Sequence, residues 1–264
     1  MGSVNKRNKK KINLFLLYMK VACDLYTSSI KFQIITKKII RKLKKNFKDI
    51  ELINVQSKKF KKNKSKIKIY WGNRISAKII QELPKLEWIH YGSTGVNVEV
   101  LKLAKTKKIQ ITNTRRMFDN AVAATVMSFI FTLARGINYS FYLKSKKKLN
   151  RKFYNKITPN IKNVFNQKIL FVGFGGIAKK ISKICKSMDM EIYGIKRKNE
   201  KFLSYIKFYR LKEIKKAVQN KDYVINLLPF TYNTKKIFNK EIFDNMKKSA
   251  FFINVGRGET VEEK

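Results

Sequence analysis

Short apolar runs alternate with longer amphipathic stretches along the chain. Each run has the length and the β-branched or aromatic content of a buried strand. The runs cover residues 20–23, 51–55, 67–71, 86–91, 109–112, 168–172, 191–195, 223–228 and 250–255. Strands that alternate with helical segments are typical of parallel sheets with crossover helices, so the pattern predicts an α/β fold.

Two helical stretches lie between these runs. Residues 37–48 place apolar side chains at helical spacing among lysines, which predicts a helix with a buried stripe and a solvated basic face. The stripe consists of Ile39, Ile40, Leu43 and Phe47. Asp119 is the expected N-cap of a long helix over 120–137 whose apolar side chains fall on more than one face. We expect this second helix to be buried on several sides between two domains.

No stretch of the chain has the roughly 18 to 20 consecutive apolar residues that cross a bilayer, so we expect a soluble, cytoplasmic protein without a membrane partner. Cys23 and Cys185 lie far apart, which argues against a disulfide framework and a cysteine zinc site and fits a reducing compartment. Residues 1–18 are interpreted as a basic extension, with Met19 as an alternative start to Met1.

Composition adds one unusual property, a net charge of +44 from 61 Lys and Arg against 17 Asp and Glu. Such a balance suggests a polyanionic partner. The lysines occur in every segment, however, and no motif of a nucleic-acid-binding fold accompanies them. We therefore attribute the charge to a general preference for lysine and expect no specific nucleic-acid partner. The alternative is that the basic residues form a surface that binds nucleic acid.

A glycine-rich turn follows directly after a predicted buried strand, in the sequence KILFVGFGGIA. Gly173, Gly175 and Ala178 match the G-x-G-x-x-A pattern in its strand–turn–helix setting. Gly173 permits the tight turn, Gly175 lets a pyrophosphate approach the backbone, and Ala178 allows close helix–strand packing. The N–H groups of Gly176 and Ile177 would bind the phosphate. The motif predicts a dinucleotide site, and the alternative is a tight corner without a ligand.

The next predicted strand ends at Ile195, where an NAD site places an acidic residue on the adenosine ribose. Lys196, Arg197 and Lys198 follow here instead. Because cations at this position would neutralise a 2′-phosphate, we expect the cofactor to be NADP in preference to NAD.

Two further segments make the pattern specific, VINLLPFTYNT at 224–234 and MKKSAFFINVGRGETV at 246–261. Together with the glycine-rich turn they resemble the D-isomer-specific 2-hydroxyacid dehydrogenase family. The resemblance covers residues 67–264 and includes EWIHYGSTGVN and ITNT. It implies a flavodoxin-like substrate domain before a Rossmann-type cofactor domain, a nicotinamide cofactor, and a small 2-oxoacid or 2-hydroxyacid substrate. We also expect a homodimer if the chain is complete, with a two-fold interface at the helix from Asn120 and the segment after it.

The resemblance gives particular residues a role. Arg257 would be the catalytic arginine, and its planar, permanently charged guanidinium suits carbonyl and carboxylate oxygens together. The backbone N–H groups of Thr94 and Gly95 would bind the substrate carboxylate. Leu228 and Pro229 would close a strand beneath the nicotinamide ribose.

The sequence also departs from the family pattern. The family's histidine acid has no match, because the single histidine, His90, precedes the carboxylate loop, and we interpret it as a packing residue. Arg115 and Arg116 follow ITNT where small residues are usual, so Arg115 is a candidate for binding an acidic substrate. Ala124 stands where a glutamate is common.

By the same resemblance, the chain would end inside the cofactor domain, before its last strands, the glutamate, the histidine and a C-terminal helix. We therefore expect an NAD(P)-dependent oxidoreductase that is impaired in this length of chain. The alternatives are a non-catalytic dinucleotide- or nucleic-acid-binding protein and a non-functional gene fragment. The expected division starts with a basic extension over residues 1–18 and a substrate domain over 19–118. An interdomain helix with linker follows over 119–150, and a truncated Rossmann domain covers 151–264.

Overall fold

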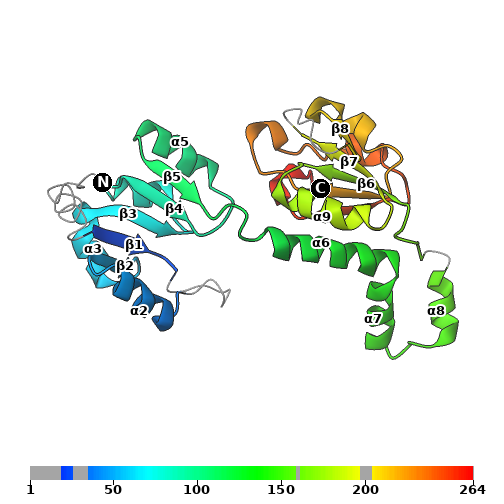
Figure 1. Cartoon of the computed structure of the whole chain (residues 1–264), viewed down its shortest axis with the longest axis horizontal. Helices are drawn as coiled ribbons and strands as arrows, with labels where there is room; N and C mark the ends of the chain where they lie inside the picture. Colours follow the sequence, from blue (N-terminus) through cyan, green and yellow to red (C-terminus); the bar gives the residue numbers. More distant parts are fainter. Residues whose placement is uncertain (1–18, 26–34, 159–160, 197–203, 264) are drawn as a thin grey trace, which may run out of the picture. The chain divides into compact units, whose positions relative to one another are not determined.

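The computed structural model describes residues 19–25, 35–158, 161–196 and 204–263. It divides into two units, residues 1–115 and 116–264, each built around one five-stranded sheet (Figure 1). All paired strands in both sheets run parallel. The predicted α/β fold is confirmed.

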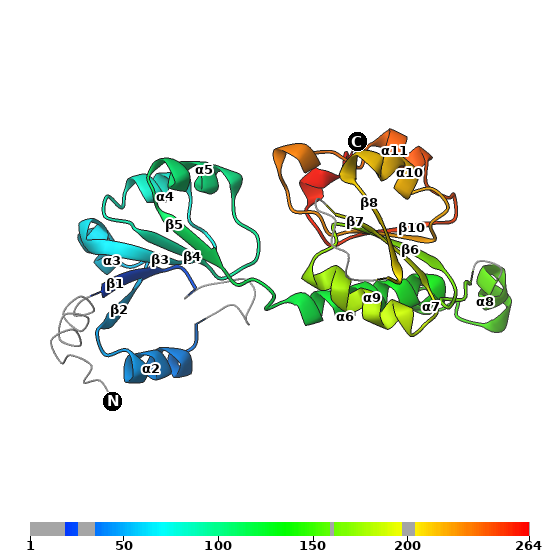
Figure 2. The ribbon, with the colours of Figure 1, turned by 45° about the horizontal axis from the view of Figure 1, so that its top comes forward.

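The first sheet has the strand order β2-β1-β3-β4-β5, which is the order of flavodoxin-like folds. Its strands are β1 (Met19–Cys23), β2 (Ile50–Asn54), β3 (Ile67–Gly72), β4 (Trp88–Tyr91) and β5 (Gln110–Asn113). Helix α2 (Lys37–Asn46) lies on one face of the sheet (Figure 2). The other face carries α3 (Lys58–Asn63), α4 (Ala77–Gln81) and α5 (Val98–Thr106), and the core of this unit lies there.

Helix α2 forms as predicted, but its expected buried stripe was wrong. No side chain of α2 is buried, and Ile39 is 44% exposed. Phe47, which follows the helix, is 53% exposed. Leu43 and Phe47 instead line a cavity of about 200 Å³ with Val21 and Leu52 of the sheet. The helix therefore stands away from the sheet and does not seal this face.

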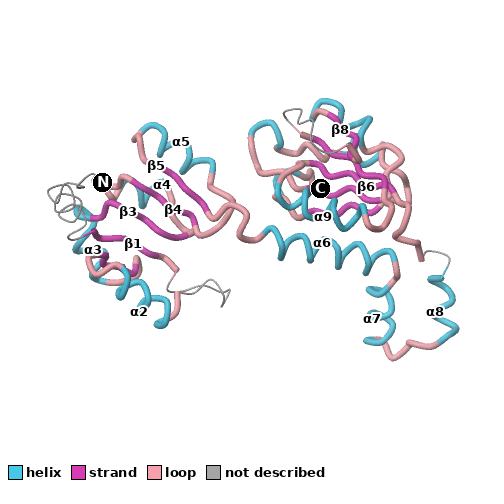
Figure 3. The backbone as a smooth tube through the Cα atoms, in the orientation of Figure 1, coloured by secondary structure: helices cyan, strands magenta, loops and turns pink. Residues whose placement is uncertain are grey.

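The second sheet has the strand order β10-β9-β6-β7-β8. Starting from β8, this is the 3-2-1-4-5 order of a Rossmann fold. Its strands are β6 (Lys168–Val172), β7 (Glu191–Ile195), β8 (Ile206–Tyr209), β9 (Tyr223–Asn226) and β10 (Phe251–Asn254). The helices of this unit are α6 (Asp119–Ala134), α7 (Ile137–Ser145), α8 (Arg151–Ile157), α9 (Gly176–Lys186), α10 (Ile214–Ala217) and α11 (Lys240–Asp244), shown with their connecting loops in Figure 3.

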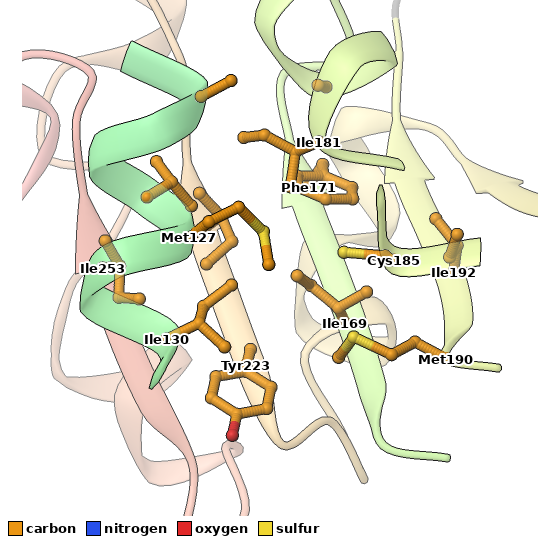
Figure 4. Packing of buried hydrophobic residues seen from close by; sticks show 14 of the residues in the cluster. Met127, Ile130, Ile169, Phe171, Ile181, Cys185, Met190, Ile192, Tyr223 and Ile253 are labelled. Carbon is orange, nitrogen blue, oxygen red and sulfur yellow. The ribbon is translucent and has the colours of Figure 1, made fainter. Parts of the chain in front are cut away.

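The largest core of the second unit lies where α6 and α9 pack on one face of this sheet, and α10 and α11 cover the other (Figure 2). Met127 and Ile130 of α6 point toward the sheet from one side, and Ile181 of α9 approaches Phe171 of β6 (Figure 4). These side chains are almost completely excluded from water. Apolar burial of this kind is the main force that holds a Rossmann sheet between its helix layers.

Two expectations about α6 were wrong. The N-cap is Phe118, and Asp119 is the first helical residue, without a capping hydrogen bond. The helix is not buried on several sides, because Phe129 is 45% exposed and Phe131 is 40% exposed. Among the described core clusters, only the one on the second sheet contains buried apolar residues of α6.

No single helix within the described ranges is long and apolar enough to span a membrane. Only α6 and α7 taken together meet the length and composition, and they are bent by 71° relative to each other. Since α6 supplies core residues to the second sheet, its apolar character already has a structural explanation.

Candidate cofactor site and substrate loop

The order of the second sheet indicates where a ligand would bind. Strand β6 pairs with β7 on one side and with β9 on the other, so the strand order reverses between β6 and β9. Open α/β sheets bind ligands outside the carboxyl ends of their strands at such a point. The loops after β6, β9 and β10 therefore form the candidate cofactor site.

The turn after β6 is built around Gly173, whose φ of +100° is one that L side chains rarely adopt. A Cβ on Gly173 would also lie 3.1 Å from the backbone carbonyl of Leu227. The N–H groups of Gly173 and Phe174 donate to the carbonyl of Ile195, at 3.2 and 3.0 Å. The turn is thus held between the end of β7 and the loop after β9, and only glycine fits its first position.

Gly175 has a different environment. Its φ is −111°, and a Cβ added there would meet no atom of the described residues within 4 Å. Helix α9 starts at the next residue without a side-chain cap, and its first N–H groups, on Gly176 and Ile177, find no acceptor among the described residues. Open space beside an uncapped helix N-terminus is what a phosphate group requires. Ala178, fully buried one turn into the helix, allows α9 to pack on β6.

Gly176 has a structural role that the sequence did not reveal. A Cβ on Gly176 would overlap the carboxylate of Asp119, the buried first residue of α6. In the packing of α6 on α9, any side chain at this position would have to displace the Asp119 carboxylate, whether or not a ligand binds. No sequence pattern signals this contact, because the two residues are brought together only by tertiary packing.

A buried asparagine joins the loops after β9 and β10. The Asn226 side-chain amide donates to Asn254 Oδ1 at 3.0 Å and to Thr260 Oγ1 at 2.7 Å, and its Oδ1 accepts from the N–H of Leu228 at 3.0 Å. Gly256 packs against the same loop, since its Cβ would lie 2.7 Å from the Leu228 carbonyl oxygen. We did not predict Asn226 or Thr260 as site residues. The available signal was the Ile-Asn pair that ends both strands, Asn226 and Asn254 being partners in register.

The structure places the predicted residues of these two loops as follows. Strand β9 ends at Asn226, so Leu228 and Pro229 lie in the loop beyond the strand and do not close it; Leu228 is buried and Pro229 is exposed. The Arg257 carbonyl accepts from Thr260 N–H at 3.1 Å, which fixes the backbone. The Arg257 side chain is exposed, with Nη1 donating to the Gly256 carbonyl at 3.2 Å.

Lys196 directly follows β7 and lies next to the glycine turn. Its N–H donates to the Tyr209 carbonyl at 3.2 Å, while the preceding residue, Ile195, accepts from Phe174 of the turn. Arg197, the second predicted cation of the ribose site, lies outside the described residues.

In the first unit, the loop after β4 carries Thr94 and Gly95. Asn113 Nδ2 donates to the Thr94 carbonyl at 2.7 Å, and Ser93 Oγ donates to the Gly95 carbonyl at 3.1 Å. Both carbonyl groups are thus held by side chains, whereas the N–H groups of Thr94 and Gly95 have no acceptor within the part of the chain that is described. Arg115 is exposed just beyond β5, at the same edge of the sheet.

His90 lies within β4 and not in a loop. Its Nδ1 is 2.8 Å from Thr112 Oγ1, which also accepts from Trp88 Nε1 at 2.8 Å. Burial lowers the pKa of His90 below its usual value, and the ring lines the cavity beneath α2. These contacts agree with a packing role for His90.

Comparison with known proteins decides the family. Residues 127–264, more than half of the chain, match the model described as D-isomer specific 2-hydroxyacid dehydrogenase, NAD binding domain. The chain belongs to the D-isomer specific 2-hydroxyacid dehydrogenase family. The matched region contains the glycine turn, the Asn226 loop and Arg257.

Similar proteins of this family are reductases and dehydrogenases. The chain is 25% identical over 193 residues to a probable 2-ketogluconate reductase of Dictyostelium discoideum, covering 72% of this chain and 57% of the relative. It is 26% identical over 197 residues to glyoxylate/hydroxypyruvate reductase B of an Enterobacter species, covering 73% of this chain and 59% of the relative. The chain therefore spans little more than half the length of these family members.

Solved structures share the fold. NAD-dependent formate dehydrogenase from Staphylococcus aureus, in complex with NAD, gives a TM-score of 0.76 at 18% identity, covering 92% of this chain and 75% of that one. An NADPH-dependent glyoxylate/hydroxypyruvate reductase from Sinorhizobium meliloti, in complex with NADP and sulfate, gives 0.74 at 18% identity, covering 92% and 74%.

Proposed function

We propose that this chain binds a nicotinamide dinucleotide at the carboxyl edge of the second sheet and serves the interconversion of a small 2-oxoacid and its 2-hydroxyacid. The observation that carries the proposal is the open space over Gly175 beside the uncapped start of α9. No described residue lies within 4 Å of a Cβ at this position, and the free N–H groups of a helix N-terminus suit a pyrophosphate in charge. Membership of the family, and the reductases similar to the chain, support the same reaction class.

The residues divide the chemistry between them. A bound nicotinamide supplies or accepts the hydride. Arg257 polarises the substrate carbonyl, because its guanidinium keeps its charge and its backbone is fixed by Thr260. The N–H groups of Thr94 and Gly95 bind the substrate carboxylate, and Arg115 is available to an acidic substrate. Leu228 and Pro229 form the loop against which the nicotinamide ribose rests.

The preferred cofactor is NADP. Lys196 follows β7 where an acidic residue would otherwise hold the adenosine ribose, and its backbone is anchored to Tyr209 beside the glycine turn. A cation there attracts a 2′-phosphate. The next two residues, Arg197 and Lys198, are also basic, so neither supplies a carboxylate for the ribose.

The assembly proposed is a homodimer formed through α6 and α7. These helices expose large apolar side chains, with Phe141 67% exposed and Tyr142 55% exposed. Phe129, Phe131 and Ile137 add to them along the same two helices. Exposed apolar residues that follow one another on neighbouring elements are typical of a protein–protein interface.

Replacement of Gly175 tests the cofactor site directly. Gly175→Val should abolish NADPH binding, because the side chain would fill the space of the pyrophosphate, and Gly175→Ala should weaken it by about tenfold, about 1.4 kcal/mol. The measurement is a titration of NADPH fluorescence with each protein. Since a Cβ at this position meets no atom of the described residues within 4 Å, thermal unfolding of Gly175→Ala should match the parent. Unchanged affinity in Gly175→Val would contradict the proposal.

A further inference from the structure

Two completely buried polar side chains link the loops after β9 and β10. Asn226 is the last residue of β9, Thr260 comes three residues after Arg257, and neither Asn226 nor Thr260 is exposed to water. A buried polar group is stable only when its hydrogen bonds are made inside the protein, and water cannot replace a bond that is lost. The hydrogen-bond partners of this pair therefore show which parts of the chain the two side chains hold.

The hydrogen bonds of the pair have a single direction. The Leu228 N–H can only donate, so Asn226 Oδ1 accepts from it, at 3.0 Å, and Asn226 Nδ2 faces Thr260. At the other end the Arg257 carbonyl can only accept, so Thr260 Oγ1 donates its one proton to that carbonyl, at 2.5 Å. The Thr260 oxygen then accepts from Asn226 Nδ2 at 2.7 Å. A chain of three hydrogen bonds thus runs from the Leu228 N–H to the Arg257 carbonyl.

Asn226 also holds the other side of the loop that carries Arg257. Its Nδ2 donates to Asn254 Oδ1 at 3.0 Å, and the same oxygen accepts from the Gly256 N–H at 3.0 Å. The loop is therefore fixed before the arginine, at Asn254, and after it, at Thr260. Hydrogen bonds in a buried chain of this kind strengthen one another, because each group is polarised by the bonds of its neighbours.

The arginine side chain depends on this support. The Arg257 guanidinium is exposed, and its Nη1 donates to the carbonyl of the neighbouring Gly256 at 3.2 Å. The direction in which the side chain leaves the loop is set by the backbone. Thr260 holds that backbone through two bonds to one carbonyl, from its N–H at 3.1 Å and from its hydroxyl. A cation with a fixed backbone loses less conformational entropy when it binds an anion.

We propose that Thr260 and Asn226 are positioning residues for Arg257, which they orient through its backbone carbonyl. This inference rests on the proposed function, because it takes Arg257 as the group that binds the oxygen atoms of the oxoacid. The chain of hydrogen bonds starts at Leu228, in the loop assigned to the nicotinamide ribose, so Asn226 holds the cofactor loop and the arginine loop to each other. Misplacement of a catalytic group by about 1 Å can cost about 100-fold in rate, which makes such support significant.

The test measures the binding of oxamate, an amide analogue of pyruvate that a reduced nicotinamide does not reduce. Its dissociation constant is measured by calorimetry with the whole chain at saturating NADPH. Thr260→Val keeps nearly the same side-chain volume and removes the hydroxyl. It should weaken oxamate binding by about 5- to 30-fold, because two buried partners lose a hydrogen bond and the arginine loop shifts. Thr260→Ser retains the hydroxyl and should bind oxamate within about threefold of the parent.

A double-mutant cycle distinguishes positioning of Arg257 from a general loosening of the site. If Thr260 acts through Arg257, Thr260→Val should change oxamate affinity by less than about twofold in an Arg257→Ala background. Thr234→Val is the matched control, because Thr234 is also buried and its hydroxyl donates to a loop carbonyl, that of Pro229, at 2.7 Å. It should leave the oxamate affinity unchanged, since this hydroxyl holds the loop after β9 alone.

Thr260→Cys, whose thiol is a weaker donor, should give an affinity between those of the serine and valine variants, and it replaces Thr260→Val if the valine variant does not fold. Parent-like oxamate affinity in Thr260→Val, or an equal loss with and without Arg257, would overturn the inference and leave the proposed function standing. Oxamate binding that Arg257→Ala does not weaken, or a parent that binds neither NADPH nor oxamate, would overturn both.

Discussion

Three neighbouring glycines show how much a sequence motif leaves open at the scale of single residues. The pattern G-x-G-x-x-A predicted the turn, the phosphate site and the roles of Gly173 and Gly175, which the backbone conformation and the open space support. It did not predict the close contact of Gly176 with Asp119, since Asp119 belongs to another helix. A motif describes local geometry, whereas contacts between elements appear only in the folded chain.

Gly173→Ala should destabilise the protein, in contrast to Gly175→Ala. Its φ of +100° and the nearby Leu227 carbonyl make an alanine strained, at a cost of about 1 to 3 kcal/mol in the free energy of unfolding. Gly175→Ala should change that free energy by less than about 0.5 kcal/mol. Urea denaturation of both variants measures the difference. Equal stability of Gly173→Ala and the parent would mean that the turn is less constrained than described.

The choice of cofactor is also decided by single residues. Lys196→Asp combined with Arg197→Ser should lower the ratio of NADPH to NADH affinity by about 10- to 100-fold, because a charge-assisted bond to the 2′-phosphate is lost and a repulsive charge is added. Competition titrations with both cofactors give the ratio. Lys180→Asp, on the exposed side of α9, controls for net charge. A parent protein that binds NADH as tightly as NADPH would contradict the preference.

At the scale of elements, periodicity located most strands but not their environment. Strand β8 was not predicted, because IKFY is short, includes a lysine and lies at the sheet edge with one buried residue. The buried stripe expected on α2 and the several buried faces expected on α6 were wrong for a related reason. Periodicity shows that a helix has an apolar face, but not how closely a neighbouring element approaches that face.

The exposed apolar face of α6 and α7 leads to a prediction about assembly. Phe141→Glu should convert a dimer into a monomer, because a charge buried at an interface costs several kcal/mol without a partner. Light scattering coupled to size-exclusion chromatography measures the mass. Tyr232→Glu, at an aromatic residue that is 87% exposed outside these helices, is the control and should leave the mass unchanged. A monomeric parent would exclude the proposed interface.

At the scale of the whole molecule, the high charge has little part in holding the fold. Most ion pairs in the described residues join exposed side chains and contribute little, and the pair of Lys247 with the largely buried Asp222 is the main exception. Each unit depends instead on apolar cores between its sheet and helices. The sequence therefore predicted the fold from apolar positions, while its most unusual property, the charge, carried little structural information.

The candidate site could be predicted only in part for the same reason. Arg257 and the glycine turn were found because the residues that define them are close in sequence. Asn226 and Thr260 were missed because each acts on loops that only the parallel sheet brings together. These residues position others, and their role is visible from hydrogen bonds alone.

The most direct test of the central claim is hydrogen–deuterium exchange of the whole chain with and without saturating NADPH. A dinucleotide at the proposed site should slow exchange in peptides that cover 173–178, 226–231 and 254–258, where the loops after β6, β9 and β10 meet. Peptides over 50–72 of the first sheet should exchange at the same rate in both samples. Protection absent from the three loops, or found only elsewhere, would contradict the account.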